Sequence, residues 1–412
     1  MERVLLVTPD LKRSSSMWGP EDRARELALL AESSGGEVVH QMVVKIDRPS
    51  PACFIGKGKV EEVSEICQRE RIDAVIFNND LTGTQQKNLE EIINTKTIDR
   101  TQLILDIFAR RAKSNEGKIQ VELAQLLYLL PRLTGRGILL SRLGGGIGTR
   151  GPGEQKLEVD RRRIRDRTVK LRRDLERHRL QRITRRKQRS KFSLLSIAIV
   201  GYTNSGKSTL LNALTESNVL MQNRLFSTLD PTVRSYILPN NQTVLFADTV
   251  GFLSDLPHHL IESFKATLEE VVNADVLLHL VDISHPRARE MERAVFSVLS
   301  ELKVTDKPII YVLNKTDRLD TIQIERHVNE FTDSIAISAL KKNNLEALID
   351  RIVLYLTSAI KTYDLCVPYN KAGLLSLIHE KGHIVKKEYL DEGVSIEVQL
   401  PVRIYNRLKK EL

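Results

Sequence analysis

Residues 196–214 read Ser-Ile-Ala-Ile-Val-Gly-Tyr-Thr-Asn-Ser-Gly-Lys-Ser-Thr-Leu-Leu-Asn-Ala-Leu. The stretch begins with an apolar run, passes through a GxxxxGKS pattern at 201–208 and ends with leucines at helical spacing. A strand that enters a glycine-rich loop and then a helix is the arrangement that binds phosphates in P-loop proteins. The stretch therefore predicts an α/β domain with a phosphate-binding loop at the end of a buried strand.

The loop at 201–208 has the residues that a nucleoside triphosphate and its metal ion require. Gly201 and Gly206 allow backbone N–H groups to face one concavity, and the helix N-terminus adds positive potential. We expect Lys207 to reach the β- and γ-phosphates and Ser208 to offer its hydroxyl to Mg²⁺. The residues predicted to contact the nucleotide are Gly201, Tyr202, Thr203, Asn204, Ser205, Gly206, Lys207, Ser208 and Thr209.

Two later segments fit the phosphate side of the same site. Asp-Thr-Val-Gly at 248–251 follows a strand pattern at 243–247, so Asp248 fits a metal-side carboxylate and Gly251 an N–H near the γ-phosphate. Phe-Ser-Thr-Leu-Asp-Pro-Thr at 226–232 should supply a second hydroxyl to Mg²⁺ when the triphosphate is bound. Thr228 is the first choice for that metal ligand, and Thr232 is the reserve.

Asn-Lys-Thr-Asp at 314–317 predicts which base is bound. Guanine presents an N1–H and an exocyclic amine, and Asp317 can accept from both, whereas adenine has an acceptor at N1. We expect Asn314 to brace the P-loop and Lys315 to stack its alkyl chain over the base. Ser338 and Ala339 follow a strand pattern at 334–337 and fit the loop whose N–H reaches guanine O6. These segments favour GTP over ATP.

The order of these segments resembles that of Ras-like GTPases. Those enzymes place a glutamine after the DxxG motif to orient the attacking water, and this chain has Phe252 there. An apolar ring cannot orient water, so we expect slow intrinsic hydrolysis until another group or a partner completes the site. The catalytic assignment is Lys207, Thr228 and Gly251. The histidines at 258–259 are alternative bases or ordinary surface residues.

The charge of the chain is concentrated in one arm. The 412 residues carry a net charge of +10, whereas Arg161–Lys191 holds sixteen Lys/Arg against three acids, a net charge of +13. Such an arm is expected to bind a polyanion, and a solvated helix face is the alternative. The candidate nucleic-acid contacts in this arm are Arg172, Arg173, Arg185 and Arg186.

A glycine-rich stretch, Thr134–Gly153, precedes the arm. It holds eight of the 21 glycines and no acid, and its arginines are Arg136, Arg142 and Arg150. Apolar residues at helical spacing flank it, which predicts a helical hairpin with a Gly/Arg tip; a flexible linker is the alternative. The second helix approximates a heptad seam formed by Leu157, Ile164, Leu171, Leu175, Leu180 and Ile183.

These patterns divide the chain into four parts. Residues 1–116 alternate strand and helix patterns and predict a small parallel α/β domain. The hairpin occupies 117–192 with its tip at 134–153, and a Ras-like GTPase domain occupies 193–361. A small α+β domain occupies 362–412, with a helix pattern at 373–380 and a strand pattern at 394–400. There is no run of 18 apolar residues and the three cysteines are scattered, so we expect a cytoplasmic protein with no membrane span and no zinc site. We also expect a monomer.

The GTPase segments together with Leu-Gly-Gly-Gly-Ile-Gly-Thr-Arg-Gly-Pro-Gly-Glu at 143–154 resemble the HflX family, in the Obg–HflX group of GTPases. The segments at 54–59 and 121–126 also resemble that family, and the resemblance runs from residue 1 to about 360.

The resemblance implies that the protein binds the large ribosomal subunit and splits stalled or idle ribosomes, often under stress. It implies that the hairpin tip approaches the peptidyl-transferase centre, which would make rRNA the polyanion that the basic arm contacts. It also implies that the ribosome stimulates hydrolysis despite Phe252. Asn204 matches a P-loop asparagine that binds K⁺ in some relatives, and K⁺ dependence is left open.

Three alternatives remain from the sequence. The chain fits a large-subunit assembly GTPase equally well. The N-terminal domain could instead bind ATP, although Gly-Lys-Gly-Lys at 56–59 is too short for a P-loop. An RNA chaperone without GTPase activity is disfavoured by the intact Lys207, Asp248 and Asp317.

Overall fold

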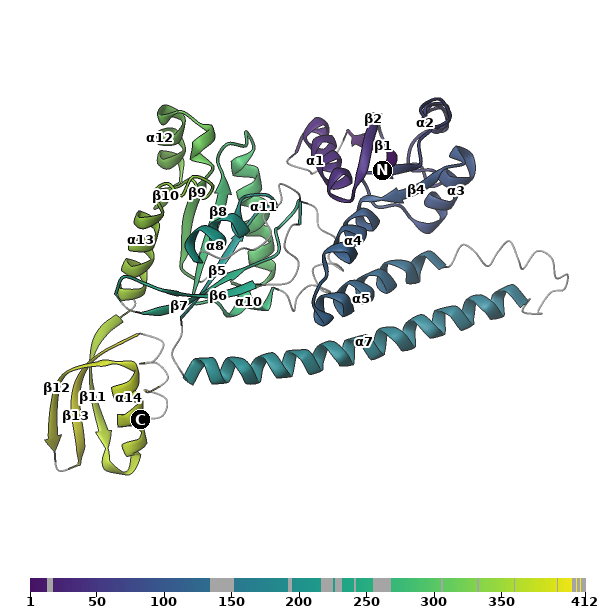
Figure 1. Cartoon of the computed structure of the whole chain (residues 1–412). Coiled ribbons are helices and arrows are strands. Elements are labelled where there is room, and N and C mark those ends of the chain that lie inside the picture. The colour runs from purple at the N-terminus through teal and green to yellow at the C-terminus, as the bar shows by residue number, and fades with distance from the viewer. Residues whose placement is uncertain are drawn as a thin grey trace.

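The computed structural model describes the chain except residues 13–17, 134–151, 192–194, 216–224, 227–231, 241, 255–267, 305–306, 332, 359, 391, 402–404, 406–407 and 409–412. Figure 1 shows an N-terminal α/β domain beside a larger α/β domain, a small C-terminal domain at the far end, and one long helix beneath the first two.

The N-terminal domain has a four-stranded parallel sheet of order β2-β1-β3-β4. Its elements are β1 (Glu2–Leu11), α1 (Pro20–Ser33), β2 (Gly36–Ile46), α2 (Lys57–Glu70), β3 (Ala74–Phe77), α3 (Gly83–Ile93), β4 (Lys96–Asp99) and α4 (Arg100–Arg111). Alternate residues of β1 face opposite sides: Leu6 packs in the core that includes α1 and α4, and Leu5 in the core that includes α2. The parallel α/β fold predicted for this domain is confirmed.

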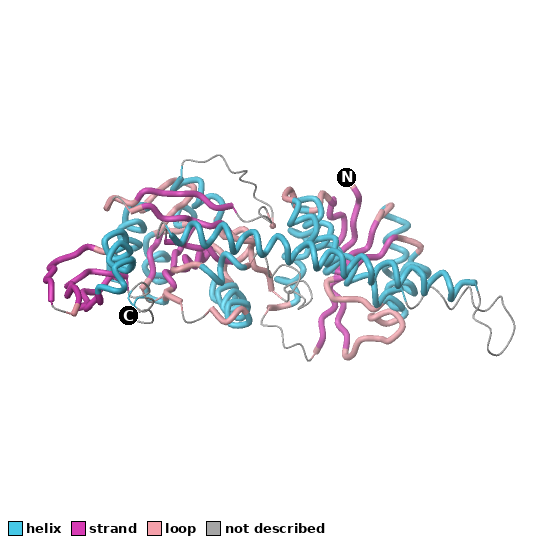
Figure 2. The backbone as a smooth tube through the Cα atoms, turned by 90° about the horizontal axis from the view of Figure 1, so that it is seen from below, coloured by secondary structure: helices cyan, strands magenta, loops and turns pink. Residues whose placement is uncertain are grey.

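Two helices form the predicted hairpin: α5 (Asn115–Arg132) and α7 (Pro152–Lys191). The buried face of α5 includes Val121, Ala124 and Tyr128, which join the core formed by α4. Figure 2 shows α7 crossing beneath both large domains.

The heptad seam predicted for α7 is only partly present. Leu171 is 2% exposed, but Leu180 is 56% exposed, so the assignment of Leu180 to an apolar seam is wrong. Ion pairs hold this part of the helix instead: Arg182 bonds both Glu116 of α5 and Glu269. An apolar seam cannot continue where α7 meets the acidic residues at the start of α5 and the start of α10.

The second large domain has a six-stranded sheet of order β10-β9-β8-β5-β7-β6, in which only β6 is antiparallel to its neighbour. Its elements are β5 (Leu195–Gly201), α8 (Lys207–Thr215), β6 (Thr232–Ile237), β7 (Thr243–Asp248), α10 (Glu269–Asn273), β8 (Val276–Asp282), α11 (Ala288–Glu301), β9 (Ile309–Asn314), η2 (Thr316–Arg318), α12 (Thr321–Glu330), β10 (Ser334–Ala336) and α13 (Leu345–Ser358). The P-loop follows β5, which lies between β8 and β7 in this sheet.

The C-terminal domain is an antiparallel sheet of order β11-β13-β12 with one helix and its own apolar core. Its elements are β11 (Ile360–Pro368), η3 (Tyr369–Lys371), α14 (Ala372–Lys381), β12 (His383–Leu390) and β13 (Gly393–Pro401). The sequence indicated α14 and β13 but not β11 or β12. Within the ranges described, no helix is long and apolar enough to cross a membrane.

Candidate GTP-binding site

The backbone between β5 and α8 forms a tight loop that only glycine permits at two points. A Cβ atom on Gly201 would collide with the carbonyl oxygen of Leu280. Gly206 has φ = +99°, and a Cβ atom there would collide with the Asn314 side chain. The two glycines thus allow β8 and the Asn314 loop to pack directly on the P-loop.

Lys207 and Ser208 lie at the start of α8, next to the end of β7. The Lys207 ammonium donates to the carbonyl oxygens of Tyr202 (2.7 Å) and Gly201 (3.1 Å). Burial lowers the pKa of Lys207 to about 8; nearby Asp248 opposes this shift and Lys315 reinforces it. The Ser208 hydroxyl donates to the Asp248 carboxylate at 2.6 Å. This hydroxyl–carboxylate pair fits a Mg²⁺ ion, which usually takes one or two protein ligands plus substrate phosphates.

The Asp248–Ser254 segment lies directly on the P-loop. The Phe252 N–H donates to the Gly201 carbonyl at 3.1 Å, and the Thr203 N–H donates to the Phe252 carbonyl at 2.7 Å. A Cβ atom on Gly251 would lie 2.9 Å from Thr203 Cα and 3.1 Å from Lys207 Nζ. Phe252 itself is 3% exposed and packs in the apolar core, so its ring does not face a water site.

The base-binding motif is joined to the P-loop by side-chain amide bonds. The Asn314 amide donates to the Ser205 carbonyl at 2.8 Å, and its oxygen accepts from the Ala339 N–H at 3.0 Å. The Ser338 hydroxyl donates to the Asp317 carboxylate. These contacts bring the residues at 314–317 and 338–339 together beside the phosphate loop.

The sequence analysis missed Asp282 as part of this site. Asp282 ends β8 and forms an ion pair with Lys315 at 2.6 Å, while Lys315 has φ = +67°. An acid at the end of a buried strand was the signal that could have identified it. The ion pair places the Lys315 alkyl chain, which the base is predicted to contact.

Several predicted residues are not placed with the others. Asn204 is exposed with φ = +60°, and Thr232 begins β6 opposite Asp248 in the ladder. Outside the described residues lie Thr228, Arg136, Arg142, Arg150 and the histidines at 258–259. Arg185 and Arg186 belong to α7, but their side chains are not described.

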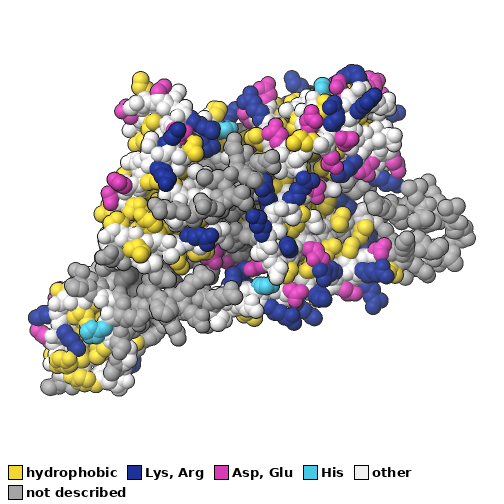
Figure 3. Space-filling view, viewed as in Figure 1, with side chains coloured by type: hydrophobic (Ala, Val, Ile, Leu, Met, Phe, Trp, Pro, Cys, Tyr) yellow, Lys and Arg dark blue, Asp and Glu magenta, His cyan; other side chains and the backbone are white. Residues whose placement is uncertain are grey.

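The basic arm is a surface feature. Arg172 and Arg173 are exposed on α7. Figure 3 shows Lys and Arg side chains gathered along the lower edge of the described surface, where α7 runs in Figure 1, with acids interspersed.

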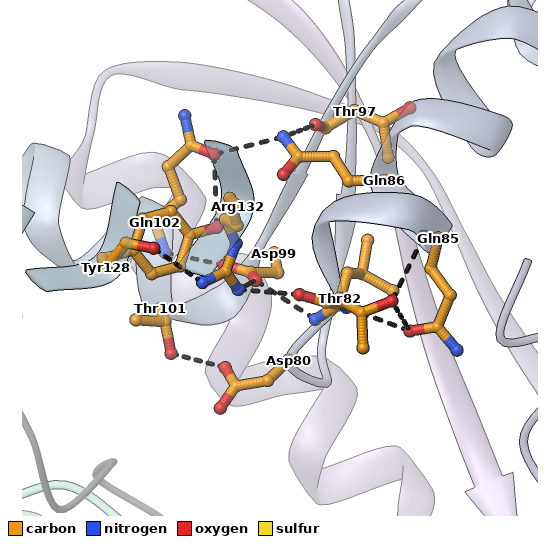
Figure 4. Close-up of polar contacts among 11 residues, drawn as sticks. Asp80, Thr82, Gln85, Gln86, Thr97, Asp99, Thr101, Gln102, Tyr128 and Arg132 are labelled. Carbon is orange, nitrogen blue, oxygen red and sulfur yellow. Dashed lines mark hydrogen bonds and ion pairs between the residues drawn. The ribbon is translucent and has the colours of Figure 1, made fainter. Parts of the chain in front are cut away.

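The N-terminal domain does not place its GKGK segment in a P-loop. Gly56 has φ = −67° and precedes α2, and no strand leads into it. A polar network occupies the carboxyl ends of β3 and β4 instead (Figure 4). There the buried Asp99 carboxylate accepts from Arg132 (2.8 Å) and from the backbone N–H of Leu81 (3.1 Å). The network ties the end of α5 to the sheet.

Family models match most of the chain. The model described as "GTP-binding GTPase N-terminal" matches residues 21–109, "GTP-binding GTPase Middle Region" matches 111–189, and "50S ribosome-binding GTPase" matches 196–315.

Individual relatives are similar to this chain over most of its length. A protein named "GTPase HflX" from Caldanaerobacter subterraneus subsp. tengcongensis is 45% identical over 389 residues, covering 94% of this chain and 90% of its own. The protein of the same name from Escherichia coli is 38% identical over 391 residues, covering 94% and 92%. A solved GTP-binding protein from Sulfolobus solfataricus in complex with GDP is 27% identical, covering 86% of this chain and 98% of its own, with a TM-score of 0.47.

One family therefore accounts for all three parts of the chain: the N-terminal domain, the hairpin and the P-loop domain. The predicted GTPase fold and GTP hydrolase activity are confirmed at the level of that family. The chain belongs to the HflX family of GTPases.

Proposed function

We propose that this GTPase binds the large ribosomal subunit and dissociates stalled or idle ribosomes, and that it works as a monomer in the cytoplasm. The observation that carries the proposal is the distribution of arginines on α7. Arg167, Arg179 and Arg182 hold the helix to its neighbours through ion pairs. Other described arginines of α7 are exposed and carry no ion pair, and these are available to a polyanion.

Those available arginines lie on the outer face of α7. In the part of the chain that the structure describes, four exposed α7 arginines have no ion pair: Arg162, Arg165, Arg172 and Arg173. Phosphate contacts of this kind release counterions, so each contributes salt-dependent affinity. rRNA of the large subunit is the polyanion that the match to a 50S ribosome-binding domain favours.

The proposed cycle uses the nucleotide site as follows. Asp317, Ala339 and Lys315 would hold guanine, and Lys207 with the loop N–H groups would hold the phosphates. Ser208 and Thr228 would hold Mg²⁺, which when bound neutralises charge on the β- and γ-phosphates. Because Phe252 cannot orient water, docking on the ribosome supplies the missing part of the catalytic site, and GDP formation releases the factor.

The test is GTP turnover and 70S dissociation with and without purified large subunits, at low and high salt. A variant with Arg172, Arg173, Arg185 and Arg186 changed to Gln is compared with the wild type. The matched control removes four exposed charges outside α7 that have no ion pair among the described residues: Lys45, Arg48, Lys57 and Lys303.

We expect large subunits to stimulate turnover, and the α7 variant to lose both stimulation and dissociation while the control keeps them. If subunits leave turnover unchanged, the ribosomal proposal is wrong and only the GTPase assignment stays. If turnover is stimulated but 70S ribosomes stay intact, and depletion causes immature subunits to accumulate, an assembly role replaces dissociation.

A further inference from the structure

The ion pair between Asp282 and Lys315 joins the ends of two neighbouring strands in the nucleotide-binding sheet. Asp282 is the last residue of β8 and lies opposite Asn314, the last residue of β9, in a parallel ladder. The Asp282 carboxylate and the Lys315 ammonium lie 2.6 Å apart, and their side chains are 14% and 15% exposed. Salt screens a partly buried pair much less than a surface pair, so this pair can hold a long side chain in one position.

Both oxygens of the Asp282 carboxylate have partners. Oδ2 pairs with Lys315, while Oδ1 accepts from the Ser284 hydroxyl at 2.6 Å and from the Ser284 N–H at 3.1 Å. The Ile283 N–H donates to the Asn314 carbonyl at 3.2 Å, which joins the turn after β8 to the end of β9. The direction of the carboxylate is therefore fixed by the turn that follows β8, and does not depend on Lys315 alone.

The backbone at Lys315 is fixed as well. Its φ of +67° lies in the left-handed region, which long side chains rarely adopt. The bonds around it hold this conformation: the Thr316 N–H donates to the Ile337 carbonyl at 3.3 Å, and the Arg318 N–H donates to the Lys315 carbonyl at 3.1 Å. Because the backbone and the ammonium are both held, the alkyl chain between them is confined.

The end of β8 lies between the two halves of the nucleotide site. β8 pairs on one side with β5, which leads into the P-loop, and on the other side with β9, which leads into the base-binding motif (Figure 1). Leu280, two residues before Asp282, lies so close to Gly201 that a Cβ atom on the glycine would collide with its carbonyl oxygen. Asp282 is thus placed between the phosphate loop and the residues predicted to hold the base.

A confined lysine alkyl chain lowers the cost of binding a base. Immobilising a long, flexible side chain when a ligand binds lowers the affinity about two- to tenfold. The ion pair with Asp282 meets this cost when the protein folds, before any nucleotide arrives. A contact with the face of the ring does not use the ring's edge, so it favours all purines alike, whereas the Asp317 carboxylate is predicted to read the edge of guanine.

We propose that Asp282 is a positioning residue that raises the affinity for purine nucleotides through Lys315, whereas Asp317 selects guanine among them. Asp282 itself contacts neither the base nor the phosphates in this role. Its contribution is therefore to nucleotide affinity and not to the rate of the chemical step. The role needs only nucleotide binding and does not depend on binding to ribosomes.

The test measures the affinities of GDP and of inosine diphosphate, which lacks the exocyclic amine, together with kcat and KM for GTP without ribosomes. The variants are Asp282→Asn, Lys315→Met, which keeps an unbranched chain without the ammonium, and the two combined. Ser284→Ala removes only a hydroxyl from the support of Asp282 and keeps the test valid if Asp282→Asn does not fold. The matched control is Glu290→Gln, which breaks a 3.0 Å ion pair with Arg287 at the start of α11, where Glu290 is 23% exposed.

We expect Asp282→Asn to weaken GDP and inosine diphosphate binding by the same factor, about fivefold. KM for GTP should rise by that factor with kcat unchanged, since slow hydrolysis lets KM report affinity. Ser284→Ala should have a smaller effect in the same direction. In the Lys315→Met background, Asp282→Asn should have no further effect, because it acts only through the ammonium.

Several results would overturn the proposal. Unchanged affinities in Asp282→Asn would show that the ion pair does not assist binding, and a larger loss for GDP than for inosine diphosphate would show that the carboxylate meets the base directly. Additive losses in the combined variant would show that Asp282 acts independently of Lys315. A fall in kcat, or the same losses in Glu290→Gln, would show a general disturbance of the domain.

Discussion

Lys207 should make nucleotide affinity depend on pH above neutrality. Burial lowers its pKa to about 8 in this structure, whereas an exposed lysine titrates above pH 10. Bound phosphates would stabilise the ammonium and raise that pKa again. At any pH at which Lys207 is deprotonated in the free protein, nucleotide binding therefore takes up a proton. Nucleotide affinity falls as the pH rises through about 8.

The magnitude follows from the protonated fraction. With a pKa of about 8, that fraction is roughly 0.9 at pH 7 and roughly 0.1 at pH 9, so GDP affinity should fall about tenfold over this range. At pH 8.5, binding should take up about three-quarters of a proton by the same relation. An ordinary lysine would give a flat profile here.

The assay is isothermal titration of GDP at pH 7.0 and 8.5 in two buffers with different ionisation enthalpies, which gives the number of protons taken up. Lys207→Arg is the control, because a guanidinium stays charged and should remove the proton uptake even if it weakens binding. A flat affinity with no proton uptake at pH 8.5 would show that Asp248 outweighs burial, and the reasoning about this lysine would be wrong.

Three further predictions follow from the site and the hairpin. Asp317→Asn should weaken GTP binding about 100-fold, because two bonds to a charged acceptor are lost. The variant should also bind xanthosine triphosphate, because the repulsion by the carboxylate is removed. An equal loss of affinity for GTP and xanthosine triphosphate would contradict the assignment. Gly251→Ala should lower GTP turnover without ribosomes about 100-fold. The added Cβ atom would lie 2.9 Å from Thr203 Cα and would displace the N–H that is predicted to meet the γ-phosphate. Turnover equal to that of the wild type would refute this role of Gly251. Leu171→Ala should lower the free energy of unfolding by about 2–3 kcal/mol, measured by heat or urea. Leu180 is 56% exposed, so Leu180→Ala should lower it by less than about 0.5 kcal/mol. Similar losses in the two variants would support an apolar seam through Leu180 after all.

The nucleotide-binding domain could be predicted from sequence because its signals are local. Each signal depends on only a few neighbouring residues: the apolar run at 195–200, the glycines at 201 and 206, and the helix that begins at Lys207. The short strand β4 was missed because four residues, Lys-Thr-Ile-Asp, carry too little alternation to stand out. β11 and β12 were missed for a related reason: neither alternates apolar and polar residues as regularly as β13 does.

The interdomain contacts could not be predicted in the same way. Glu26 resembles any surface glutamate until α4 and the P-loop are placed beside it. A weak signal was present, because Arg23 and Glu26 share a helical face with the buried residues Leu27 and Leu30. Charged residues within an apolar stripe indicate a buried polar contact, but the stripe alone does not say where the partner lies in the chain.

Phe252 connects the catalytic question with the domain arrangement. Its ring lies in one continuous apolar core with Phe226 and with Phe108 of the N-terminal domain, and the last two rings meet edge to face at 4.7 Å. A glutamine here would face that apolar core and leave its amide without water. The residue at the position of the water-orienting glutamine therefore stabilises the contact between the nucleotide-binding domain and the N-terminal domain. On this reasoning a Phe252→Gln change should not restore Ras-like hydrolysis. It should lower the free energy of unfolding by about 1–3 kcal/mol, because it buries an amide without a hydrogen-bond partner. Measuring turnover and urea unfolding in the same variant separates these results, and faster turnover with unchanged stability would show that the ring only occupies the place of a catalytic amide.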